Sequence, residues 1–169
     1  MGTLYESICQ ATFESIRLDN QTEQQCQELA QKLARGITER LQAPSGTLSL
    51  ASPAGPPGLG ESPPISQCMR RLGKLTWEFG ETLIVRHPDG DGLLGQAWGT
   101  FTIRRTGNHY RLSWGRDDME LLYPEPDPSI ISALASSLHK DLLRLAKGGS
   151  RKGRPEIGFF PAEQEETAA

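Results

Sequence analysis

The chain has 169 residues, which is enough for one ordinary domain but leaves little for a second. Only 36 % of the residues are hydrophobic, and glycine (18) and proline (12) are plentiful, so we expect part of the chain to lie outside a packed core. The net charge of −3 gives no global basic surface for nucleic acid, and no apolar run approaches the roughly 20 residues of a membrane span.

Three cysteines, Cys9, Cys26 and Cys68, form an odd set without paired spacing, which argues against a disulfide framework. Cys9 and Cys26 fall on apolar helix faces, so we expect them to be buried reduced thiols. Reduced cysteines are typical of a reducing compartment, and the N-terminus lacks a secretory pattern. We therefore expect a cytoplasmic protein.

Residues 1–42 are predicted to form a helical hairpin that acts as an N-terminal arm. Thr3 and Glu6 match a capping box at the start of a first helix over 3–17. The break is expected at Asp19, and Thr22 is expected to cap a second helix. Each helix carries apolar residues at three- and four-residue steps. These residues are Leu4, Ile8, Cys9, Phe13 and Ile16 in the first helix, and Cys26, Leu29, Leu33, Ile37 and Leu41 in the second.

Residues 43–65 contain six prolines and four glycines and are predicted to be a flexible linker. The segment from Pro53 to Pro56 also fits a P-x-x-P recognition motif. It has no adjacent basic residue, so a plain tether is favoured over a ligand for an aromatic groove.

From Met69 to Tyr123 the apolar period changes from 3.6 to 2, which predicts five short antiparallel strands in a meander. A hairpin turn is expected at Gly80-Glu81. The five strands are predicted at about 74–79, 82–87, 95–105, 109–114 and 119–123. One face is apolar and must be covered.

Asp127 is predicted to cap a C-terminal helix whose stripe of Ile130, Leu134, Leu138, Leu142 and Leu145 would cover that face. The sheet and helix over 66–147 would then form one unit, followed by a flexible charged tail at 148–169. The fold class is α+β. This order of elements is similar to that of cystatin-like folds and type III secretion chaperones, in which a helix lies across a curved sheet.

No catalytic, metal or cofactor site is predicted. Asp89 and Asp91 have the D-x-D spacing of a cation site, but the rest of a calcium loop is missing, so a solvated turn is favoured. Asp117, Asp118 and Glu120 are acidic neighbours in a predicted turn. The histidines are scattered without zinc-ligand spacing.

The leading hypothesis is a non-enzymatic accessory protein, such as an adaptor, assembly factor or chaperone-like subunit, that binds another protein. Candidate contact residues are basic and surround the third predicted hairpin. They are Arg104, His109, Arg111 and Arg116. The N-terminal helices are a second candidate surface, and they are also expected to allow homo-oligomers.

Two alternatives remain open at this point. A small-molecule or enzymatic pocket between sheet and helix would use Trp98, Tyr110 and Trp114 as walls. Single-stranded nucleic acid would bind the face that carries Arg104 and Arg111. Because the aromatic residues are expected on the opposite face, nucleic acid is the less favoured partner.

Overall fold

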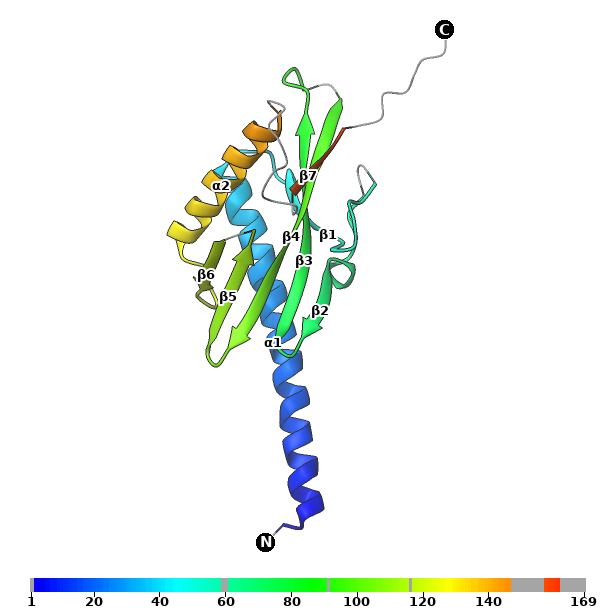
Figure 1. Cartoon of the computed structure of the whole chain (residues 1–169), viewed down its shortest axis with the longest axis vertical. Helices are drawn as coiled ribbons and strands as arrows, with labels where there is room; N and C mark the ends of the chain where they lie inside the picture. Colours follow the sequence, from blue (N-terminus) through cyan, green and yellow to red (C-terminus); the bar gives the residue numbers. More distant parts are fainter. Residues whose placement is uncertain (1, 59–60, 91, 116, 147–156, 162–169) are drawn as a thin grey trace.

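The structure is a computed structural model that describes residues 2–58, 61–90, 92–115, 117–146 and 157–161. One long helix, a twisted antiparallel sheet and a second helix form the body (Figure 1). The elements are α1 (Leu4–Arg40), β1 (Leu48–Ala51), the 3₁₀ turn η1 (Ile65–Gln67), β2 (Met69–Gly73), β3 (Thr76–Arg86), β4 (Leu93–Thr106), β5 (His109–Trp114), β6 (Asp117–Leu121), α2 (Pro128–Ala146) and β7 (Ile157–Pro161). The α+β class and the antiparallel sheet are confirmed.

The predicted N-terminal hairpin is wrong, because α1 is one helix of 37 residues. Asp19 does not break it, since aspartate costs a helix interior well under 1 kcal/mol and neither proline nor glycine is nearby. Thr22 is not a cap. It is buried within the helix, and its hydroxyl accepts a hydrogen bond from Arg105 at 3.1 Å. The capping box at Thr3 and Glu6 is present as predicted.

The sheet has the order β1-β3-β4-β5-β6. β2 and β1 share one edge of β3, where β2 pairs with the residues up to Phe79 and β1 with Gly80 onward. On the far edge of β4, β7 pairs with 95–99 and β5 with 101–106. Every pairing is antiparallel.

The hairpin predicted at Gly80-Glu81 is wrong, because β3 runs through both residues as a single strand. Gly80 is instead required by a close backbone contact. A Cβ atom there would lie 2.4 Å from the backbone oxygens of Ala51 and Ser52. Glycine is needed at this position because the backbone at the end of β1, Ala51 and Ser52, lies directly against Gly80.

The segment predicted as a linker, 43–65, contains β1 and contacts the sheet. Trp98 donates its indole N–H to the Ser52 oxygen at 3.0 Å. Gln96 donates to the Pro57 oxygen at 2.8 Å and accepts from Thr82 at 3.0 Å. Residues 52–58 therefore lie against the sheet face opposite the helices.

Both helices cover the same face of the sheet and contact each other. Asp127 caps α2 as predicted, since its carboxylate accepts from the Ser129 N–H at 2.8 Å. Gly36 lies at the crossing of the helices, where an added Cβ would meet Ile131 Cδ1 at 2.7 Å. The largest fully buried side chains of the core include Leu29, Leu33, Ile37, Phe79, Ile103, Leu112, Leu121 and Leu134.

The predicted charged tail at 148–169 lies outside the described residues, apart from β7. Arg116 and Asp91 also lie outside them.

Candidate partner-binding surface

Three of the predicted basic contact residues, Arg104, His109 and Arg111, lie on the neighbouring strands β4 and β5, and we call them the basic strip. Arg104 and Arg111 are directly opposite each other on β4 and β5, and both are exposed. Arg111 is also opposite Glu120 on β6. His109 Nδ1 lies 2.9 Å from a Glu120 carboxylate oxygen. The described part of this strip therefore carries both charge signs.

The three aromatic residues predicted to line a pocket lie on two faces of the sheet. Trp98 faces residues 52–58. Tyr110 and Trp114 are buried on the helix-covered face, where Trp114 stacks on Phe101 with centroids 4.9 Å apart. The Tyr110 hydroxyl hydrogen-bonds Gln25 of α1. The two rings on that face are thus part of a filled core.

One carboxyl group is buried within that core. Glu81 follows Phe79 and precedes Leu83 on the same face of β3, and it is only 5 % exposed. Burial raises the pKa of this carboxyl well above its usual value. The cavity beside it, bordered by Trp98 and Leu138, has a volume of only about 10 Å³. Such a space fits about one water molecule and no substrate.

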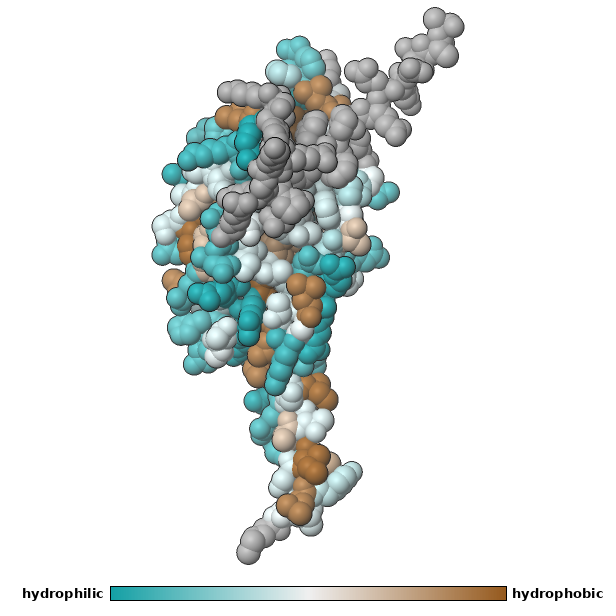
Figure 2. All heavy atoms as spheres, in the orientation of Figure 1, coloured by the Kyte–Doolittle hydropathy of each residue, from teal (hydrophilic) through white to brown (hydrophobic). Residues whose placement is uncertain are grey.

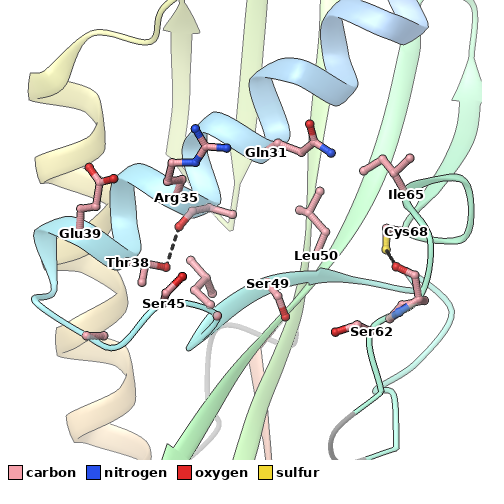
Figure 3. A pocket seen from close by; sticks show the side chains of 15 residues that line it. Gln31, Arg35, Thr38, Glu39, Ser45, Ser49, Leu50, Ser62, Ile65 and Cys68 are labelled. Carbon is pink, nitrogen blue, oxygen red and sulfur yellow. Dashed lines mark hydrogen bonds between the residues drawn. The ribbon is translucent and has the colours of Figure 1, made fainter.

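An open groove of about 570 Å³ lies between the C-terminal half of α1, β1 and residues 62–68. Figure 3 shows that most of its labelled side chains are polar, among them Arg35, Glu39 and Ser49. Cys68 lies at one end, where its thiol donates to the Pro64 oxygen at 3.5 Å. Burial raises the pKa of this thiol, which disfavours the reactive thiolate.

One of the two cysteine predictions is wrong. Cys9 is exposed, because the part of α1 that carries it does not touch the body. Cys26 is buried as predicted, and burial raises the pKa of its thiol to about 12. Cys68, for which no helix face was predicted, is also buried, at 1 % exposed.

The most distinctive surface is the N-terminal part of α1, residues 4–18, which we call the projecting segment. It extends away from the body as a bare helix (Figure 1), and every residue of it is exposed. Its large apolar side chains appear as brown patches along the helix in Figure 2. Their exposed fractions are Leu4 88 %, Tyr5 74 %, Ile8 63 %, Phe13 61 %, Ile16 55 % and Leu18 37 %.

Two apolar stripes run along the projecting segment. The first, with Leu4, Ile8 and Leu18, continues the stripe that α1 buries further on. The second consists of Tyr5, Cys9, Phe13 and Ile16 at three- and four-residue steps. In the anchored part of α1 the corresponding positions are polar, including Asn20, Gln24, Gln27 and Gln31. The second stripe therefore ends where the helix reaches the sheet.

Polar contacts along the sheet fix the direction in which the segment projects. Asp19 of α1 accepts a hydrogen bond from Arg71 on β2 at 3.1 Å. Further along, Glu28 accepts from the Tyr123 hydroxyl at 2.7 Å, and Lys32 pairs with Glu125 at 2.7 Å. A straight helix held at several points keeps its free end in a defined place.

Comparisons with protein-family models, with curated proteins and with solved structures found no match to this chain. Among the described residues, no group of three or more His, Cys, Asp and Glu side chains is placed to hold a metal ion. None of the described helices has the length and apolar character needed to cross a bilayer.

Proposed function

We propose that the chain is a non-enzymatic accessory protein, an adaptor or assembly factor, that binds another protein through the projecting segment. The observation that carries this proposal is the second apolar stripe, Tyr5, Cys9, Phe13 and Ile16. These residues are exposed, and the stripe is absent from the part of α1 that packs on the sheet.

The physical argument is the free energy of exposed apolar surface. Burial of apolar area is worth about 25 cal/mol per Å², and contiguous exposed patches of this kind mark interaction sites. A helix that presents apolar residues at i, i+4, i+8 and i+11 fits an apolar groove or a second helix on a partner.

The segment is also prepared for binding. An isolated helix of about 15 residues is only marginally stable in water. In this chain the helix grows from the anchored half of α1 and is capped by Thr3 at its free end. The entropy lost on binding is thereby reduced, because the backbone is already ordered.

Charge argues against an anionic membrane as the binding partner. Residues 4–18 contain one basic residue, Arg17, against Glu6 and Glu14. Interfacial membrane helices typically carry several lysines or arginines on their polar face. A protein surface is therefore the favoured partner.

Site-specific photo-crosslinking in a native lysate tests the proposal. A benzophenone amino acid replaces Ile8 or Phe13 on the apolar face, and Ser7 or Gln10 on the polar face as matched controls. We expect discrete adducts with a protein, identified by mass spectrometry, from the apolar positions only. Equal adducts from both faces, or adducts to this chain's own sheet, would contradict the proposal.

A further inference from the structure

We propose that the protein bound by the projecting segment is a second copy of this chain, and that the two segments pair antiparallel. This inference names the partner of the surface described above and therefore rests on the proposed function. It is carried by the area of the apolar surface, by the symmetry of its stripe and by the position of its charges.

The area matches that of a homodimer. At the measured exposures, the six large apolar side chains of one segment present on the order of 700 Å². A standard specific interface takes about 800 Å² from each partner. The two stripes lie about 100° apart around the helix, so the helix pair buries the second stripe and part of the first, and the surface where α1 enters the body supplies the remaining contact.

The stripe is self-complementary when reversed. An antiparallel pair of second stripes, centred between Gln10 and Ala11, sets Tyr5 of one copy opposite Ile16 of the other and Cys9 close to Phe13 of the other. Tyr5 and Ile16 are 11 residues apart, which is about three helical turns, so they lie on the same face. The side chains of the second stripe then meet one another, as an isologous two-fold interface requires.

The charges also complement each other in this arrangement. Glu6 and Arg17 are 11 residues apart as well, so they flank the stripe on one side. An antiparallel second copy brings Arg17 of each chain near Glu6 of the other, giving two symmetric ion pairs at the rim. Such pairs add orientation more than affinity.

The length of the segment fits the same arrangement. The segment of 15 residues is about 22 Å long, and its free end would reach the partner where α1 enters the body. Asp19 and Arg71 form an ion pair at that point, and the neighbouring Leu72 is 52 % exposed. Leu4, the most exposed apolar side chain, would approach this apolar residue of the second copy.

The first experiment measures the mass of the full chain by light scattering and sedimentation over a range of concentrations. We expect twice the chain mass of 18.6 kDa, with reversible dissociation on dilution. The double variant Ile8→Glu, Phe13→Glu should weaken the dimer at least about tenfold. Ser7→Glu on the polar face is the control and should leave the dimer unchanged. Because residues 7, 8 and 13 are exposed, all these variants should keep the circular dichroism spectrum of the native chain.

The second experiment tests direction. In a Cys9→Ser background, Tyr5→Cys and Ile16→Cys variants are treated with a short bismaleimide, alone and mixed. Antiparallel pairing predicts a crosslinked dimer in the mixture and almost none from either variant alone. Crosslinking of each variant with itself would overturn the antiparallel arrangement.

A chain that stays monomeric at every concentration would overturn the dimer itself. The proposed function would survive that outcome if Ile8 and Phe13 still form photo-adducts with a different protein. It would fail together with the dimer if they form none.

Discussion

Arg71 on β2 and Asp19 on α1 form an ion pair of 3.1 Å at the point where the long helix leaves the sheet. Arg71 also lies over the Trp77 ring, 5.8 Å from its centroid. On one side of this pair α1 packs into the core through Cys26, Leu29 and Leu33. On the other side all its side chains are exposed. The pair therefore marks the boundary between the part of α1 that stabilises the fold and the part that we propose binds a partner.

The close approach of Ala51 and Ser52 to Gly80 predicts a large loss of stability for any side chain at that position. We expect Gly80→Ala to lower the free energy of unfolding by about 3 kcal/mol, because the new methyl group would meet two backbone oxygens that cannot move independently. Gly73→Ala on β2 is the control, since nothing lies within 4 Å of its added Cβ. Urea unfolding of both variants measures the difference. Equal stabilities would show that the backbone of Ala51 and Ser52 does not lie this close to Gly80.

The cross-strand pairing of Arg104 with Arg111 predicts different effects for two charge reversals. Arg104→Glu should stabilise the chain by about 0.5 kcal/mol, because it replaces a like-charged pair by an opposite one. Arg111→Glu should give no net gain, since the new carboxylate would also lie opposite Glu120. Thermal unfolding at low and high salt measures both effects. A destabilising Arg104→Glu would contradict the pairing of these two arginines.

The buried Glu81 carboxyl predicts a specific pH dependence. Burial raises its pKa above the ordinary value of 4.5, so the folded chain keeps a proton that the unfolded chain releases. This contribution to stability is complete below about pH 4.5 and is lost as the pH rises through the pKa of the folded state. We expect Glu81→Gln to remove this decline in the free energy of unfolding with rising pH.

Urea unfolding between about pH 5 and about pH 8 compares this variant with the native chain. Glu39→Gln, at an exposed position on α1, serves as the control and should keep the native slope. Parallel pH profiles for the native chain and Glu81→Gln would mean that Glu81 is not buried.

The contact between Trp98 and Ser52 predicts that residues 52–58 are held on the sheet. Trp98→Phe removes the indole donor and should cost about 1 kcal/mol. Hydrogen exchange at Ser52, Ala54, Gly55 and Gly58, the residues of this segment that have an amide hydrogen, should become faster in this variant, while exchange in the β4–β5 hairpin stays unchanged. Rapid exchange of residues 52–58 in the native chain itself would instead support the free linker that the composition predicted.

Local patterns predicted several elements well. The capping box at Thr3, the buried stripe from Cys26 to Ile37, the strand after Asn108 and the cap at Asp127 are all found where local chemistry placed them. Each depends on interactions between residues close in sequence, which hydrophobic period and capping preference report directly.

The predictions that were wrong concern residues whose contacts are made with distant parts of the chain. Asp19 does not end α1, and its carboxylate instead binds Arg71 on β2, a contact between residues far apart in the chain that the local pattern does not show. Gly80 looks like a turn residue, but it is required by the backbone of Ala51, which is 29 positions away in the chain. The apolar stripe of residues 4–18 was visible in the sequence. The exposure of this stripe could not be predicted, because periodicity identifies the apolar face of a helix but does not show what covers that face.

Hydrogen exchange of the backbone amides of residues 4–18 tests most directly whether the projecting segment is the binding surface. We expect faster exchange here than in residues 22–40 of the dilute monomer, since the segment is helical but no packing protects its hydrogen bonds. On association with its partner, whether a second copy or another protein, exchange of these amides should slow by about tenfold or more, while residues 22–40 stay equally protected throughout. Exchange of residues 4–18 that is the same before and after association would contradict a role for this segment in binding.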